Sequence, residues 1–191
     1  MRIHLEPATA LVVQEAGNLF ETATAVFDPT YTYRYLLTRT WGPGPGVLFV
    51  MLNPSTADAD HDDPTLRRCT GFARTLGCGA LAVVNLYALR ATDPHELAGH
   101  PDPIGPATDH VIDLAAAHAD RYVAAWGAHP AARTRTAVVA ATVNRQAARH
   151  HRPGLACLGL TKSRQPRHPL YLPKTATLRA YDADTTTKET R

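Results

Sequence analysis

Polar residues follow three short apolar runs of this sequence, in positions where they could bind a ligand. In chain order they are Asn53-Pro54-Ser55 after 47–52, Asn85 after 80–84, and Trp126-Gly127 after 122–125. A fourth segment, 161–172, contains His168. Amide and imidazole side chains both donate and accept hydrogen bonds, so they can bind a polar ligand or position a water molecule.

Each of these residues also has a purely structural interpretation. Asn-Pro commonly begins a turn, which would account for Asn53 without any chemistry. Asn85 could cap a strand, and His168 could be an ordinary surface residue. Trp126 could be a core residue, and Tyr87 could either pack in the core or stack on a ligand.

The elements that would position these residues alternate between strand and helix. Continuous apolar runs predict buried strands at 47–52, 80–85, 121–127 and 155–160. Helical patterns lie between them, and Asp63-Pro64 is a typical N-cap and first helical residue. We therefore expect a three-layer α/β/α sandwich with a mainly parallel four-stranded central sheet, plus an N-terminal hairpin over 20–42. In such sheets, ligands bind at the carboxyl ends of the strands.

The composition is that of one globular domain. The chain has 191 residues, of which 45% are hydrophobic and 19% charged, enough for a core. We expect a single domain over 1–175, with its core at 46–173, and a flexible tail at 176–191. No apolar run is long enough to span a membrane, and the N-terminus lacks a signal-peptide pattern, so we expect a cytoplasmic protein. We also expect a monomer. The three widely spaced cysteines predict buried free thiols.

Several common catalytic motifs are absent from the sequence. There is no GxGxxG or GxxxxGK[ST] motif for a nucleotide and no GxSxG nucleophile elbow. No HExxH or HxxxH pair indicates a metal site, and we expect neither a metal nor another cofactor. His61 among the aspartates of 58–63 remains an alternative cation site.

Four segments together resemble motifs of the uracil-DNA glycosylase superfamily. "LFVMLNPS" is similar to its strand ending in Asn-Pro-Gly, and "GALAVVNLYAL" to its base-reading strand. "YVAAWGAHPAAR" resembles its Leu-Trp-Gly strand, and "PRHPLYLP" its last His-Pro-Ser motif. The motifs occur in the superfamily's order over about residues 47–173. The pattern is also similar to an uncharacterised bacterial domain family related to that superfamily.

The resemblance implies a monofunctional DNA glycosylase that flips a base out of the duplex and leaves an abasic site. Asn53 would hold the attacking water, and His168 would donate to the base oxygen as negative charge develops there. Asn85 would read the edge of a pyrimidine, with Tyr87, Pro54 and Ser55 as further contacts.

The departures from these motifs point away from uracil. Met51 replaces the usual Gly, Ser55 follows Pro54, and Leu170 stands where the superfamily has Ser. The acidic loop 58–63 follows Asn53 directly, and carboxylates accept hydrogen bonds from hydroxyl groups. We therefore expect Asp58 and Asp63 either to contact an enlarged, hydroxyl-bearing base or to help activate the water. Glucosylated hydroxymethylcytosine of phage DNA is such a base, which implies a role in antiphage defence.

Charge is distributed unevenly along the chain. Residues 1–120 have 7 Lys/Arg and 14 Asp/Glu, a net charge of 7 − 14 = −7, whereas 121–191 have 13 and 3, a net charge of 13 − 3 = +10. The basic part favours double-stranded DNA as the partner. The expected phosphate contacts are Lys162, Arg164, Arg167 and Lys174, with Leu170 or Tyr171 filling the gap that a flipped base leaves.

Four other functions fit part of this pattern. A repair glycosylase for uracil or a damaged base would use the same residues. A nucleoside or nucleotide hydrolase would not need the basic loop. A sensor of modified DNA would keep Asn85 and that loop but would not depend on Asn53. A metal-dependent hydrolase would use His61 and the aspartates, and a chelator would inactivate it.

Overall fold

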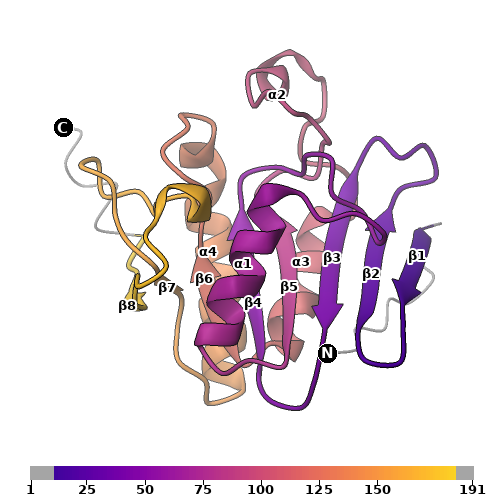
Figure 1. Cartoon of the computed structure of the whole chain (residues 1–191). Coiled ribbons are helices and arrows are strands. Elements are labelled where there is room, and N and C mark those ends of the chain that lie inside the picture. Colours follow the sequence, from indigo (N-terminus) through magenta and orange to yellow (C-terminus); the bar gives the residue numbers. More distant parts are fainter. Residues whose placement is uncertain (1–10, 184–191) are drawn as a thin grey trace.

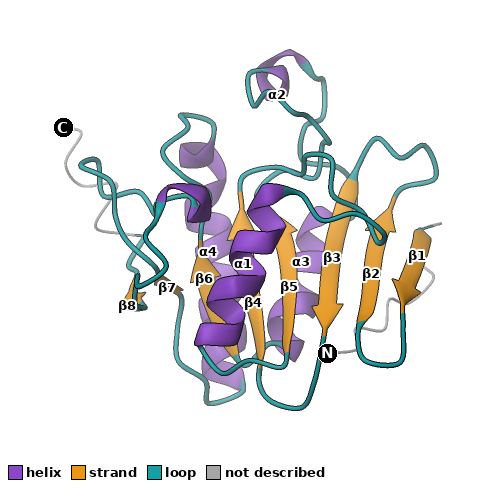
Figure 2. Cartoon of the chain, in the orientation of Figure 1, coloured by secondary structure: helices purple, strands orange, loops and turns teal. Residues whose placement is uncertain are grey.

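The computed structural model describes residues 11–183 as a single sheet with helices on both of its faces (Figures 1 and 2). The strands are β1 (Val12–Gly17), β2 (Thr22–Phe27), β3 (Arg34–Thr40), β4 (Gly46–Met51), β5 (Ala80–Asn85), β6 (Arg121–Ala124), β7 (Ala156–Cys157) and β8 (Arg179–Ala180). The helices are α1 (Pro64–Thr75), α2 (Glu96–Gly99), α3 (Thr108–His118), α4 (Ala132–Arg149) and the 3-10 turn η1 (Pro169–Tyr171).

The sheet corrects the predicted fold class. Over the described residues it has eight strands in the order β1-β2-β3-β5-β4-β6-β7-β8. β5, β4, β6 and β7 pair in parallel, but the pairs β1–β2, β2–β3, β3–β5 and β7–β8 are antiparallel. The prediction of a mainly parallel four-stranded sheet in a three-layer sandwich is therefore wrong.

The error has a physical cause in β3. The alternating stretch around it predicted a hairpin separate from the main sheet, but Leu37 to Thr40 pair with Val83 to Ala80 of β5. This pairing joins the hairpin to the sheet and buries both faces of β3 up to Thr38. A single sequence shows that a strand is apolar, but not which neighbour will complete its hydrogen bonds.

The core lies on both faces of the sheet because successive side chains of a strand point to opposite faces. In β4, Val47 and Phe49 pack on the face that α1 covers, and Leu48 and Val50 pack toward α3 and α4. All six residues of β4 are buried. Cys69, Cys78 and Cys157 are buried and free, as predicted, and burial raises the pKa of all three thiols.

Helix α1 begins as its sequence predicts. The Asp63 side chain caps the helix by accepting a hydrogen bond from the Leu66 amide at 2.7 Å, and Pro64 occupies the first turn. The chain leaves the helix through Gly77, whose φ of +72° favours glycine. The cap fixes the position of Asp63 beside the carboxyl ends of β4 and β5.

The ends of the chain lie partly outside the described residues. The expectations for the N-terminus fall largely on 1–10, and those for the tail fall partly on 184–191. Within 176–183, Arg179–Ala180 forms β8, which pairs with β7. Among the described residues, no helix is both long enough and apolar enough to cross a membrane.

Candidate active site

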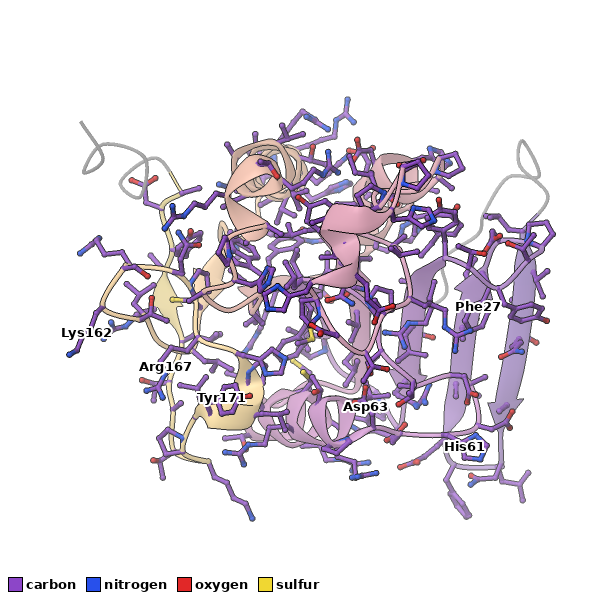
Figure 3. All side chains as sticks on the ribbon, turned by 90° about the horizontal axis from the view of Figure 1, so that it is seen from above. Phe27, His61, Asp63, Lys162, Arg167 and Tyr171 are labelled. Carbon is purple, nitrogen blue, oxygen red and sulfur yellow. The ribbon has the colours of Figure 1, made fainter. Side chains whose placement is uncertain are left out.

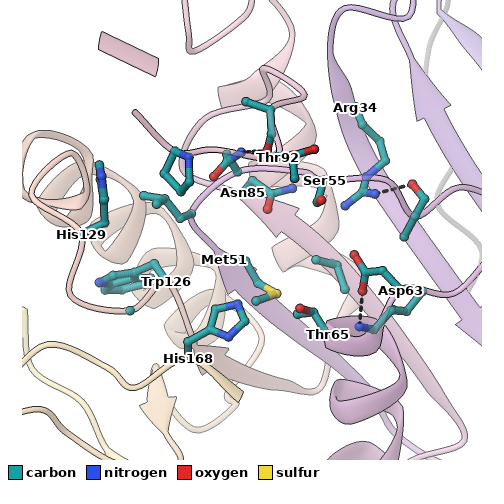
Figure 4. A pocket seen from close by; sticks show the side chains of 18 of the residues that line it. Arg34, Met51, Ser55, Asp63, Thr65, Asn85, Thr92, Trp126, His129 and His168 are labelled. Atoms are coloured by element: carbon teal, nitrogen blue, oxygen red, sulfur yellow. Dashed lines mark hydrogen bonds between the residues drawn. The ribbon is translucent and has the colours of Figure 1, made fainter. Parts of the chain in front are cut away.

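A cavity of about 440 Å³ opens at the carboxyl ends of β4, β5 and β6 (Figure 4). These strands are parallel neighbours, with Met51 opposite Asn85 and Val50 opposite Ala124, so their ends meet at one edge of the sheet. The predicted site residues that line the cavity are Asn53, Ser55, Asp63, Asn85, His168 and Tyr171. Residues far apart in the sequence therefore share one site.

Asn53 is tied to the loop that follows β5. Its amide nitrogen donates to the carbonyl oxygens of Ala91 at 2.7 Å and Pro54 at 3.1 Å. The Ala91 amide in turn donates to the Pro54 carbonyl at 3.0 Å. These bonds fix the side chain and leave Oδ1 without a partner among the described residues, so Oδ1 can accept a hydrogen bond from a water or a ligand.

Asn85 has an unsatisfied donor. It is the last residue of β5 and is only 3% exposed, and its Nδ2 is buried without a hydrogen-bond partner. A buried amide without a partner costs free energy, so such groups are uncommon in folded proteins. The side chain lines the cavity, where an acceptor on a ligand would satisfy it.

His168 is held as a neutral donor. Its Nδ1 accepts a hydrogen bond from the Leu170 amide at 3.4 Å, which leaves the proton on Nε2. Burial lowers the pKa of His168 below its ordinary value, although the charge of Asp63 opposes the shift. Figure 4 shows the ring directed into the cavity beside Met51.

Trp126 and Tyr87 differ in where their rings lie. Trp126 lines the cavity, is 1% exposed, and donates from Nε1 to Oε1 of the buried Gln165 at 3.1 Å. Tyr87 lines a separate hollow, and its hydroxyl group donates to the Ala131 carbonyl at 2.8 Å. The cavity wall thus includes Trp126, and the predicted contact residue Tyr87 is not among its lining residues.

Most of the acidic loop is engaged in its own turn. Asp58 accepts hydrogen bonds from the Asp60 and His61 amides at 2.9 and 2.8 Å, and Asp62 forms an ion pair with Arg39 at 2.7 Å. Burial alone would raise the pKa of Asp58, but these amides and the His61 ring outweigh it and lower the pKa. Asp58 does not line the cavity, whereas Asp63 does.

A basic segment lies beside the cavity, around η1. Leu170 is 41% exposed and Tyr171 is 72% exposed. Arg167 donates to the Tyr171 carbonyl at 2.8 Å, so it supports the turn. Arg68 of α1 donates to the carbonyls of Pro169 and Leu172, so it connects η1 to α1.

The other cations of this segment are exposed. Lys162, Arg164 and Lys174 have no side-chain partner within the part of the chain that the structure describes. Figure 3 shows Lys162, Arg167 and Tyr171 on one side of Asp63, and His61 of the acidic loop on the other. The basic and acidic segments are therefore separated in space.

The sequence did not indicate Arg34 as a site residue. Arg34 lines the cavity but is only 4% exposed, and burial lowers the pKa of its guanidinium to about 10. It donates from Nη1 to the Ala57 carbonyl, and its Nε is buried without a partner. An arginine in a hairpin strand would normally reach solvent. Arg34 can be identified as a cavity residue only once β3 is known to pair with β5. Thr65, Thr92 and His129 also line the cavity and carried no sequence signal.

No cluster of three or more His, Cys, Asp or Glu side chains that could hold a metal ion occurs among residues 11–183. His61 and Asp58 do contact each other, at 3.2 Å, but outside the cavity. The pair alone does not make a metal centre, and the cavity residues supply amide, imidazole, guanidinium and carboxylate groups instead.

Comparison with known proteins identifies a family for this chain. Residues 34–170, which include Arg34, Asn53, Asn85 and His168, match the family described as "Protein of unknown function (DUF1643)". No curated protein matches the chain. The family match provides no link to the uracil-DNA glycosylase superfamily, so that resemblance rests on the four motifs alone. Because the match covers most of the chain, the protein belongs to the DUF1643 family.

Proposed function

We propose that this protein is a DNA glycosylase that hydrolyses the N-glycosidic bond of a modified pyrimidine flipped out of the duplex. The observation that carries the proposal is the convergence of Asn53, Asn85 and His168 on one cavity, with the Asn85 amide donor unsatisfied. The four motifs described above assign roles to these three residues in one reaction. The type of reaction is inferred from the resemblance, and the chemical groups that it requires line the cavity.

The first chemical requirement is a water below the sugar. In the proposed reaction the water adds its oxygen to C1′ as the bond from C1′ to the base breaks, and the base keeps the electron pair. The water proton is finally transferred to the base, so atoms and charge balance. Asn53 suits the task because its Oδ1 can orient a water without placing a further charge beside the cationic sugar.

The second requirement is a partner for the departing base. Negative charge moves onto the base oxygen during bond cleavage, and a fixed donor stabilises it in the transition state. His168 is neutral and carries its proton on Nε2, and Figure 4 shows its ring directed into the cavity. Asn85 can donate to an acceptor on the base edge and thereby satisfy its own amide.

The third requirement is access to a base in DNA. Leaving the stack costs a few kcal/mol, which is offset when a side chain fills the gap. Leu170 and Tyr171 are exposed beside the cavity, and Lys162, Arg164 and Lys174 are free to contact phosphates. These exposed cations favour DNA over a free nucleoside as the substrate.

The test is a cleavage assay on duplexes that carry uracil, hydroxymethylcytosine or glucosylated hydroxymethylcytosine. Alkali converts each abasic site into a strand break. We expect breaks with one modified base, and a rate lower by about 100-fold or more in Asn53→Ala and His168→Ala. Asn144→Ala, at an exposed asparagine of α4, is the matched control and should keep the activity.

Each other outcome identifies a different function. Breaks at uracil alone would indicate repair in place of defence against modified phage DNA. Tight binding to DNA without any breaks would indicate a sensor. Neither breaks nor binding would refute the proposal and favour a small-molecule substrate.

A further inference from the structure

The Arg34 guanidinium is buried in the cavity wall without a carboxylate partner. Within 11–183 the guanidinium donates a hydrogen bond to the neutral Ala57 carbonyl, its Nε has no partner, and the residue forms no ion pair. A buried charge is costly unless it is paired and hydrogen-bonded. One neutral acceptor does not offset that cost, so the Arg34 guanidinium needs further hydrogen-bond acceptors. A ligand bound in the cavity could supply them.

Asp63 lines the same cavity and supplies the opposite charge. One of its oxygens accepts from the Leu66 amide as the cap of α1, and it forms no ion pair with Arg34. Its negative charge nevertheless favours the protonated form of Arg34. The two side chains therefore offer several donors and a strong acceptor to whatever lies between them.

The two ends of the cavity differ in chemistry. Figure 4 shows Arg34 and Asp63 at one end, His168 and Trp126 at the other, and Asn85 between them. The volume of about 440 Å³ lies within the range of pockets that hold drug-sized ligands, roughly 300–1,000 Å³, and exceeds what one pyrimidine ring requires. The end at Arg34 is thus available to a group attached to the ring.

The geometry of a pyrimidine shows which group this is. C2 and C5 are opposite atoms of the ring, so a base whose O2 meets His168 directs its C5 substituent toward the far end of the cavity. We infer that Arg34 and Asp63 form a specificity subsite for an uncharged, hydroxyl-bearing C5 substituent such as a sugar. The inference rests on the proposed function, because it places the base with O2 at His168.

The opposite charges of Arg34 and Asp63 favour an uncharged, hydroxyl-bearing group. A hydroxyl group donates and accepts, so it can bond to a guanidinium and a carboxylate at once. A phosphate or carboxylate on the base would be attracted by Arg34 but repelled by Asp63. A methyl group would leave both charges unsatisfied.

The experiment measures binding of two free nucleosides, 5-hydroxymethyl-2′-deoxycytidine and its glucosylated form, by calorimetry. Asp63→Asn is the informative variant, because Asn caps a helix about as well as Asp and so preserves α1. We expect wild type to bind the glucosylated nucleoside about ten-fold or more tightly than the other, and Asp63→Asn and Arg34→Lys to lose that preference. Asp60→Asn, the same change at an exposed position of the loop, should retain it.

The outcomes separate this inference from the proposed function. Equal binding of the two nucleosides by wild type, or full preference in a folded Asp63→Asn protein, would overturn the subsite. Cleavage of modified duplexes without such a preference would leave the glycosylase standing and refute the subsite. A preference lost in Asp63→Asn, without cleavage of any duplex, would support the subsite in a protein that is a sensor.

Discussion

Asn85 is a residue that stability alone would not favour. The strand before it is apolar, and all six residues of β5 are buried, so an apolar side chain would fit this environment. The unpaired Nδ2 instead destabilises the folded protein by about 1–3 kcal/mol. The proposed contact with a base would account for an amide that is retained at the expense of stability.

Asn85→Leu, which changes the amide to an apolar group of similar shape, should therefore separate stability from function. We expect the free energy of unfolding in urea to be higher by about 1–3 kcal/mol, and cleavage or nucleoside binding to be lost. Asn144→Leu is the control, because it removes the acceptor of the Leu155 amide at 2.8 Å and should lower stability with activity retained. A large loss of stability in Asn85→Leu would mean that Asn85 has a structural role.

His168 should make stability depend on pH below neutrality. Its pKa in the folded protein lies below the ordinary value of 6.5, so the unfolded chain binds its proton at a higher pH. Stability from this group is complete above pH 6.5 and is lost as the pH falls toward the folded pKa. In His168→Gln, urea unfolding measured over this range should show a smaller decrease, whereas His110→Gln, at an exposed position of α3, should behave like wild type.

Helix α1 links the carboxyl ends of the central strands to the turn η1, which contains Leu170 and Tyr171. Asp63 at its start reaches the cavity, and Arg68 one turn later donates to the carbonyls of Pro169 and Leu172. The Arg68 guanidinium also lies over the Phe72 ring, 5.0 Å from its centre. One helix thus positions two parts of the candidate site.

Arg68→Met should release η1 without dismantling the core, since Met keeps the apolar stem over Phe72. We expect faster hydrogen exchange at the Leu170 to Leu172 amides, a loss of about 1–2 kcal/mol in stability, and weaker DNA cleavage. Arg67→Met, whose arginine donates to the Asp62 carbonyl, is the neighbouring control. Unchanged exchange around η1 would show that other contacts hold the turn.

The sequence predicted single elements better than their assembly. The cap and proline at Asp63-Pro64 and the apolar run of β4 depend on local chemistry, and both were predicted correctly. β8 consists of Arg179–Ala180, which has no apolar pattern, and it forms because β7 offers an edge. Arg34 lies in the cavity wall because β3 pairs with β5. This long-range pairing could not be predicted from a single sequence.

At the scale of the whole molecule, the basic segment around η1 lies apart from the acidic loop 58–63. Residues 121–191 have a net charge of +10, and Lys162 and Arg167 lie on the side of Asp63 opposite to His61 (Figure 3). DNA bound over the basic segment would therefore avoid the acidic loop. Arg167 supports the Tyr171 carbonyl, which leaves Lys162, Arg164 and Lys174 as the cations available for phosphates.

Binding to duplex DNA should consequently weaken with salt in proportion to these three cations. Each neutralised phosphate contributes a slope of about −0.9 to log K against log salt, so three contacts give about −2.7. Fluorescence anisotropy with a labelled duplex should yield this slope, and Lys162→Ala, Arg164→Ala and Lys174→Ala should each reduce its steepness by about 0.9. Arg145→Ala, whose arginine pairs with Asp113 at 2.8 Å on α4, should leave the slope unchanged. If binding by wild type does not depend on salt, phosphate contacts are excluded, and with them DNA as the partner. If only Arg145→Ala reduces the slope, the DNA interface lies on α4 and not around η1.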